Sequence, residues 1–253
     1  MNKDVSSQTL NELISSNPDL RDYLEKIEQE NRLILSRFTH ELRNPLTLLK
    51  STIQLIETKH PEAKDFIFWN QLIPDIEETI GLLDELSIYN HCDQLNLETV
   101  DYIKLVQQAI QSAQAYASSK QVIIKLVNTT FDPLLTSIYC DKVKMKQLLL
   151  NLLKNASEAA FESSNITVEL SIENGPKTNG HYINLSITNL GIPIPIECLS
   201  NIFEPFVTTK QNGTGLGLAV AKKIATLHKG DLSVSQTESA VTFTLLFPIE
   251  WTV

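Results

Sequence analysis

The chain has 253 residues, of which 42% are apolar and 20% are charged, and this composition is ordinary for a soluble globular protein. Its net charge of -9 argues against nucleic acid or an anionic membrane surface as a partner. It contains no apolar run of about 18 residues, so we expect no membrane span. Cys92, Cys140 and Cys198 show no C-x-x-C spacing, and we expect them to be small core residues in a reduced cytoplasmic setting.

Glycine placement divides the chain, because Gly81 is the only glycine before Gly175. The first ninety-odd residues therefore read as helix, and the remainder reads as a mixed domain. The first helix is predicted over about 19–58, with Asn17 as its N-cap and Pro18 in its first turn.

Apolar residues recur along this first helix at steps of three and four, which is the spacing of a bundle seam. They are Leu20, Leu24, Ile27, Ile34, Phe38, Leu42, Leu46, Leu49, Ile53 and Ile56. A second helix over 62–90 follows a short turn at His60 and Pro61, so the two helices are expected to be antiparallel neighbours. Such a pair buries too little surface to stand alone, and we predict a homodimeric four-helix bundle.

His40 lies on the first helix but off its apolar stripe, two residues from both Phe38 and Leu42. Asn44 follows on the same face, and Pro45 removes a backbone hydrogen bond one turn below. Taken alone, His40 reads as a surface histidine. Glu41, Asn44 and Pro45 beside it shift the balance toward a functional histidine.

From about residue 99 the pattern alternates between helix and strand, which predicts an α+β domain with helices over a mostly antiparallel sheet. Helices are predicted over 101–118, 141–162, 196–203 and 216–228. Strands are predicted over 121–127, 135–139, 165–172, 182–189, 231–236 and 241–247.

Two segments of this domain suggest a nucleotide site. On the 141–162 helix Asn151, Asn155 and Gln147 share one face, and Glu158 lies a turn further. Amide oxygens are suitable ligands for Mg²⁺, which is usually completed by water and substrate phosphates. The alternative is a solvated polar helix face.

The second segment is a glycine cluster before a predicted helix, where close backbone approach and the helix N-terminus favour a phosphate. A flexible turn is the alternative for this segment. The residues concerned are Lys210, Gly213, Thr214, Gly215, Leu216 and Gly217.

Four motifs, in this order along the chain, resemble those of the sensor histidine kinases of two-component systems. His40–Leu46 is similar to the phosphoacceptor box, Asn151–Ala156 to the asparagine box, Phe203–Phe206 to the phenylalanine motif, and Gly213–Leu218 to the second glycine box. The resemblance extends over about residues 29–248. It is nearest to the cytosolic sporulation-type and nitrogen-type kinases.

The resemblance implies a lead-in over 1–28, a dimerisation and histidine-phosphotransfer domain over 29–95, and a Bergerat-type ATP-binding domain over 99–253. It also implies that His40 attacks the γ-phosphate of ATP while Glu41 accepts the proton of the other ring nitrogen. The phosphoryl group would then pass to an aspartate on the receiver domain of a response regulator. Asn44 matches a position that orients water for dephosphorylating that partner.

By the same resemblance, Asn155 would hold Mg²⁺, Asn151 would lie near the phosphates, and residue 189 would face the adenine amino group. The chain departs from the family here: the first glycine box, Asp-x-Gly-x-Gly, reads Asn189-Leu190-Gly191-Ile192-Pro193. Replacing the carboxylate by an amide weakens the bond to adenine by on the order of 1 kcal/mol. Two alternatives therefore stay open: a degenerate kinase acting as a relay or phosphatase, and a regulatory binding partner of another kinase.

Overall fold

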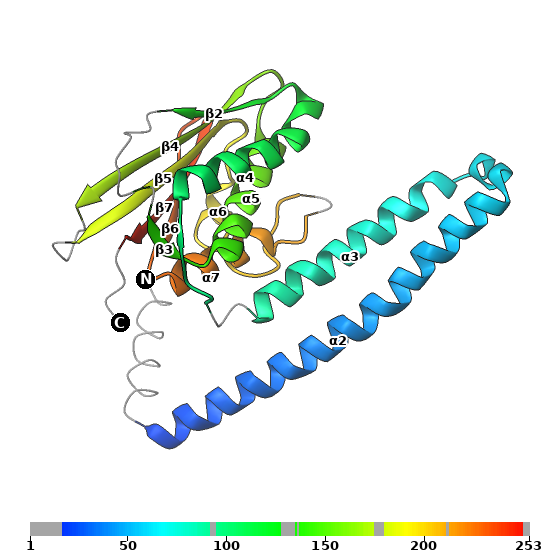
Figure 1. The fold of residues 1–253 in the computed structure, drawn as a ribbon, viewed down its shortest axis with the longest axis horizontal. Helices are drawn as coiled ribbons and strands as arrows, with labels where there is room; N and C mark the ends of the chain where they lie inside the picture. The colour runs from blue at the N-terminus through cyan, green and yellow to red at the C-terminus, as the bar shows by residue number, and fades with distance from the viewer. Residues whose placement is uncertain are drawn as a thin grey trace. The chain divides into compact units, whose positions relative to one another are not determined.

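The computed structural model describes residues 17–91, 95–127, 135, 137–174, 180–210 and 213–249. The chain forms two compact units that divide after His91 (Figure 1). Residues 1–16 of the expected lead-in, Cys92, and two residues of the glycine-rich loop, Gln211 and Asn212, lie outside the described residues.

The first unit is an antiparallel helical hairpin, as the sequence predicts (Figure 1). Helix α2 spans Pro18–Lys59 and α3 spans Trp69–His91, with a short 3₁₀ helix, η1, at Pro61–Asp65 between them. The predicted cap is confirmed: Asn17 Oδ1 accepts a hydrogen bond from Leu20 N at 3.2 Å. Helix α2 continues through Pro45, which has no N–H to donate to the Glu41 carbonyl.

The prediction of one helix over 62–90 is wrong at its beginning. Residues Pro61–Asp65 form the 3₁₀ helix η1, and α3 begins only at Trp69. Phe68 between them takes a positive φ of 68°, which a right-handed helix does not permit. Phe66 therefore lies in the connection, where it makes an edge-to-face contact with Trp69 at 6.4 Å between ring centroids.

Polar pairs connect α2 to α3, and much of the apolar stripe of α2 remains exposed. The pairs are the ion pairs Arg43–Asp84 and Lys50–Glu77 and a 3.0 Å hydrogen bond from Trp69 Nε1 to Glu57 Oε1. The exposed stripe residues include Ile34, Phe38, Leu42, Leu49 and Ile56. Among the described residues, the hairpin thus leaves much of the apolar face of α2 exposed.

The second unit is a five-stranded sheet with helices on one face, which confirms the α+β expectation (Figure 1). The strand order is β2-β4-β5-β7-β6, with β2 and β4 parallel and the other neighbours antiparallel. The strands are β2 (Ile123–Val127), β4 (Asn165–Asn174), β5 (His181–Leu190), β6 (Asp231–Gln236) and β7 (Ala240–Pro248).

Helices α4, α5 and α7 pack together and cover the apolar face of this sheet. The helices and the short 3₁₀ helix of this unit are α4 (Tyr102–Ala117), η2 (Ser118–Lys120), α5 (Lys142–Ala159), α6 (Ile196–Leu199) and α7 (Gly217–Leu227). Burial alternates along β5, so every second side chain faces the helices.

Several element ends differ from the sequence prediction. Helix α5 stops at Ala159 rather than near 162, because Ala160 turns into extended backbone and forms an isolated bridge with Gly191. Helix α6 ends at Leu199 rather than 203. Strand β2 begins at Ile123 because Gln121 adopts a left-handed conformation, with φ of 56°. A small second sheet pairs β1 (Glu98–Val100), which the sequence pattern missed, with β3 (Ile138–Cys140).

A buried histidine connects the beginning of α5 to the end of α7. His228 Nε2 accepts from the backbone N–H of Asp141 at 3.1 Å, and its Nδ1 lies 2.8 Å from the Ile224 carbonyl. Asp141 in turn caps α5 by accepting from Lys144 N at 3.0 Å. Burial lowers the pKa of His228, although the bond to Ile224 opposes this, so the ring is held neutral with its proton on Nδ1.

Within the described residues, none of the helices is both long enough and apolar enough to cross a membrane. Cys140 is buried, as expected, and burial raises the pKa of its thiol to about 12. Cys198 is only partly buried, so its assignment to the core is wrong.

Candidate nucleotide-binding site

The polar face of α5 forms one wall of the candidate site. The buried leucines of α5 fix the rotation of the helix, and this leaves Gln147 and Asn151 half-buried on the other side. Gln147 Nε2 donates to Asn151 Oδ1 at 3.1 Å, and Asn151 Nδ2 donates to the Gly217 carbonyl at 3.0 Å. Asn151 therefore joins α5 to the first residue of α7.

The side chain of Lys210 bridges two of the predicted site residues on α5. Its Nζ donates to Asn155 Oδ1 at 2.7 Å and pairs with Glu158 Oε2 at 2.5 Å. Two oxygen atoms of the kind that bind hard metal ions thus converge on one positive group, the Lys210 ammonium, at the end of α5. The spacing of 155 and 158 predicted a shared face, but nothing in the sequence showed that Lys210, more than 50 residues later, would lie on it.

The glycine-rich loop is built from residues that depend on having no side chain. Gly215 has a φ of 68°, and a Cβ there would lie 2.5 Å from the Phe206 carbonyl carbon. A Cβ on Gly213 would lie 2.3 Å from Thr208 Oγ1. The loop therefore lies against the backbone of Phe206 and Val207 and the side chain of Thr208, with Phe206 N donating to the Gly215 carbonyl at 3.1 Å.

The loop leads directly into α7. There the backbone N–H of Leu216 donates to the Thr214 hydroxyl oxygen at 3.0 Å. Leu216 is buried and serves as an apolar anchor for the beginning of the helix. The first backbone N–H groups of α7 adjoin the loop, an arrangement that favours an anion. Lys210 precedes the loop, and its ammonium is paired with the Glu158 carboxylate.

Asn189 lies at the carboxyl end of β5, and its side chain is 1% exposed. Among the described residues its Nδ2 finds no hydrogen-bond partner, and leaving such a donor unpaired costs about 1–3 kcal/mol. Gly191 lies next to it, where a Cβ would come within 2.0 Å of the Ala159 carbonyl oxygen. The segment after Gly191 is held by a reciprocal pair: Gln236 Oε1 accepts from Ile194 N at 2.8 Å, and Gln236 Nε2 donates to the Ile194 carbonyl at 2.9 Å.

Sequence reasoning missed Gln236, the residue that clamps this segment. Its strand context gave no sign of the contact, because Ile194 lies 42 positions away. The substitution of glycine by Pro193 is consistent with the observed path, since the neighbouring N–H of Ile194 supplies the bond to Gln236.

In the first unit, His40, Glu41 and Asn44 are all exposed on α2. Thr39 beside them is fully buried and donates through Oγ1 to the Leu35 carbonyl at 2.7 Å. His40 therefore points away from the packed side of the hairpin, as its place off the apolar stripe predicted.

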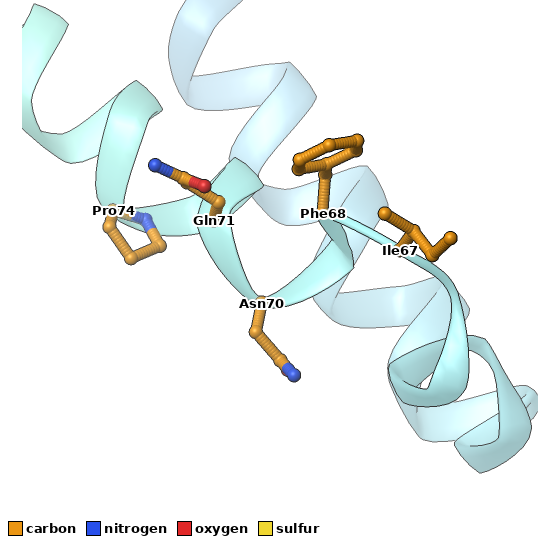
Figure 2. Close-up of a pocket in the computed structure, with 5 residues that line it drawn as sticks. All are labelled: Ile67, Phe68, Asn70, Gln71 and Pro74. Carbon is orange, nitrogen blue, oxygen red and sulfur yellow. The ribbon is translucent and has the colours of Figure 1, made fainter.

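A shallow hollow opens at the beginning of α3, away from these residues in the sequence. Figure 2 shows its lining: Ile67, Phe68, Asn70, Gln71 and Pro74. None of these side chains is titratable, so the hollow offers no acid, base or nucleophile for chemistry.

Residues 140–250 match the family of histidine kinase-, DNA gyrase B- and HSP90-like ATPases. Sporulation kinase E of Bacillus subtilis is 28% identical over 90% of this chain and 31% of its own length. The sensory histidine kinase/phosphatase NtrB of Azospirillum brasilense is 29% identical over 85% of this chain and 54% of its own. Sensor histidine kinase ZraS of Escherichia coli is 31% identical over 84% of this chain and 44% of its own.

Solved structures agree on the fold. Full-length ShkA, solved in complex with AMPPNP, superposes with a TM-score of 0.72 over 87% of this chain and 46% of its own, at 21% identity. Histidine kinase AdeS of Acinetobacter baumannii gives a TM-score of 0.57 over 84% of this chain and 98% of its own, at 22% identity.

The chain spans about a third to a half of the lengths of the three curated relatives named above. Residues 140–250 belong to the histidine kinase-, DNA gyrase B- and HSP90-like ATPases, and the chain as a whole is related to the sensor histidine kinases.

Proposed function

We propose that the chain is an ATP-dependent protein-histidine kinase that phosphorylates His40 and passes the phosphoryl group to an aspartate of a response-regulator receiver domain. The observation that carries the proposal is that the polar face of α5 meets two parts of the glycine-rich segment: Asn155 and Glu158 bind Lys210, and Asn151 bonds to Gly217 at the beginning of α7. This arrangement offers a cation site and an anion site side by side, which is what a metal-bound triphosphate requires.

The donor set of this site suits Mg²⁺. Asn155 Oδ1 and Glu158 Oε2 are hard oxygens that already converge on one positive group, the Lys210 ammonium. We assign Asn155 as the metal ligand, with phosphate oxygens and water completing the shell. When bound, the metal would neutralise charge on the phosphates, and Lys210 would then be released toward them.

The environment of His40 fits a phosphoacceptor. One nitrogen of the exposed imidazole attacks the γ-phosphorus, the bond from that phosphorus to the β,γ-bridging oxygen breaks, and ADP leaves. Glu41 takes the proton from the other ring nitrogen, which keeps the attacking nitrogen nucleophilic. Asn44, one turn further on the same exposed face, orients water for dephosphorylating the regulator.

The exposed apolar stripe of α2 supports a homodimer. Phe38 and Leu49 are each more than half exposed, although they occupy seam positions of a helical bundle. A second hairpin packed on this face would complete a four-helix bundle and bury the stripe. The proposed dimer leaves His40 outside the seam.

The test is phosphorylation of the purified chain with γ-labelled ATP and Mg²⁺. We expect acid-labile label on the chain, no label on His40→Gln, and transfer of label to a receiver domain. His60→Gln is the matched control, because His60 is also an exposed histidine with a glutamate partner, Glu62, at 3.0 Å. Label that survives in His40→Gln, or no label on the unaltered chain, would contradict the proposal.

A further inference from the structure

Asn189 is a polar group set into an apolar row. Along β5 the side chains that face the helices are Ile183, Leu185, Ile187 and Asn189, and all four are buried. Its register neighbours, Ile166 on β4 and Val241 on β7, are buried and apolar as well. The sheet therefore surrounds this amide with hydrocarbon and supplies no side-chain partner from the adjacent strands.

The amide points to where α5 ends. Its Nδ2 lies 2.9 Å from the position that a Cβ on Gly191 would take, and that position is also in contact with the Ala159 carbonyl. Ala159 follows Glu158 directly, so the unpaired donor lies at the same end of α5 as the oxygens that hold Lys210. A buried donor that lacks a partner beside a candidate nucleotide site is suited to a polar atom of the ligand.

We propose that Asn189 allows the pocket to accept 6-oxopurine as well as 6-aminopurine nucleoside triphosphates. The inference rests on the proposed function and on the resemblance to the sensor histidine kinases, which implies that residue 189 faces position 6 of the purine. An amide presents one donor and one acceptor, and a half-turn about its last torsion exchanges them. A 6-aminopurine offers a donor at position 6 and an acceptor at N1, whereas a 6-oxopurine offers these groups in reverse order.

A carboxylate at this position would discriminate, because it presents acceptors alone when ionised. Its oxygen would face the carbonyl oxygen of a 6-oxopurine with no proton between them, and a buried acceptor pair of this kind is strongly disfavoured. The neutral amide removes that repulsion. It also suits the apolar row around it better than a buried charge would.

The experiment compares binding of ATP and inosine triphosphate (ITP), with Mg²⁺, to the full chain by isothermal titration calorimetry. ITP differs from ATP at position 6 and in the protonation of N1, so the pair isolates the edge that Asn189 would face. We expect the two dissociation constants to lie within about threefold of each other for the unaltered chain. Asn189→Asp is expected to favour ATP by at least about tenfold, which corresponds to about 1.4 kcal/mol.

Two further variants keep the comparison informative. Asn189→Ala removes both polar groups and is expected to weaken ATP and ITP equally, and it serves if Asn189→Asp does not fold. Asn184→Ala is the matched control, because Asn184 lies on the same strand but on the other face, where it bonds to Glu173 at 2.6 Å. This control is expected to leave the ATP-to-ITP ratio unchanged.

The outcomes separate this inference from the proposed function. If the unaltered chain binds ATP but binds ITP more than about threefold more weakly, the inference is overturned and the kinase proposal stays intact. Equal ratios for the unaltered chain and a folded Asn189→Asp also overturn it. If neither nucleotide binds, both the inference and the proposed function fail.

Discussion

Replacing His228 by leucine tests how much the link between α5 and α7 stabilises the second unit. The substitution removes the acceptor of the buried Asp141 N–H, which costs about 1–3 kcal/mol, and the bond to Ile224, which adds about 0.5–1.5 kcal/mol. The Ile224 carbonyl keeps the backbone N–H of residue 228 as a donor at 3.1 Å. We therefore expect a loss of about 3 kcal/mol, and a fall in melting temperature of roughly 6–12 °C for a unit of this size.

The same variant should change the pH dependence of stability. Burial lowers the pKa of His228 in the folded chain, so below the unfolded value of about 6.5 the unfolded chain binds a proton that the folded chain does not. The stabilisation from His228 is complete above that pH. It is lost as pH falls toward the folded pKa, at up to about 1.4 kcal/mol per pH unit.

Urea unfolding followed by circular dichroism from pH 7 to pH 5 measures both effects. The stability gap between the unaltered chain and His228→Leu should narrow as pH falls, because the variant has no imidazole to protonate at that position. His181→Leu is the matched control, since His181 is exposed at the beginning of β5. Parallel pH profiles for the unaltered chain and His228→Leu would refute the reasoning.

Three further predictions concern the core and the site. Tyr102→Phe should leave the free energy of unfolding in urea titrations unchanged or raise it by about 1 kcal/mol. The reason is that the buried Tyr102 hydroxyl has no hydrogen-bond partner among the described residues. A loss of more than about 1 kcal/mol would contradict this. Gly215→Ala should weaken nucleotide binding at least about tenfold in calorimetry, since its Cβ would overlap Phe206, whereas unchanged affinity would show that the loop does not hold the phosphates. Lys210→Met should weaken ATP binding by roughly two- to tenfold and flatten its salt dependence, and equal salt slopes would show that Lys210 does not reach the phosphates.

The sequence predicted the elements that have strong periodicity or a clear cap. Helix α2 follows its apolar spacing and its Asn17 cap, and the leucine face of α5 is buried as expected. The strands of the large sheet were predicted because their side chains alternate over a single covered face. These features depend on local spacing, which one sequence displays directly.

The errors arose where backbone conformation or distant contacts decide the outcome. Positive φ at Phe68 and Gln121 moved the beginnings of α3 and β2, and neither residue type signals such a conformation. Strand β1 is three residues long and depends on pairing with β3. In the site, the face of Asn151 and Asn155 was predictable from helical spacing, but the bridge from Lys210 was not, because it requires the tertiary fold.

Pro45 lies inside α2 and gives the helix a point at which it bends more easily. One hydrogen bond of the helix is missing at Glu41, next to His40. Lys50 and Glu57 join the segment after Pro45 to α3, and before Pro45 an ion pair joins Arg43 to Asp84 close to the bend. The arm from Pro45 back to Pro18 is about 40 Å long at 1.5 Å per residue, so a bend of about 10° swings its far end by about 7 Å. The same bend shifts His40, close to the pivot, by only about 1 Å. A displacement of several ångströms at the far end of the helix thus moves His40 by only about 1 Å. Shifts of that size are large enough to change the alignment of a nucleophile with phosphorus.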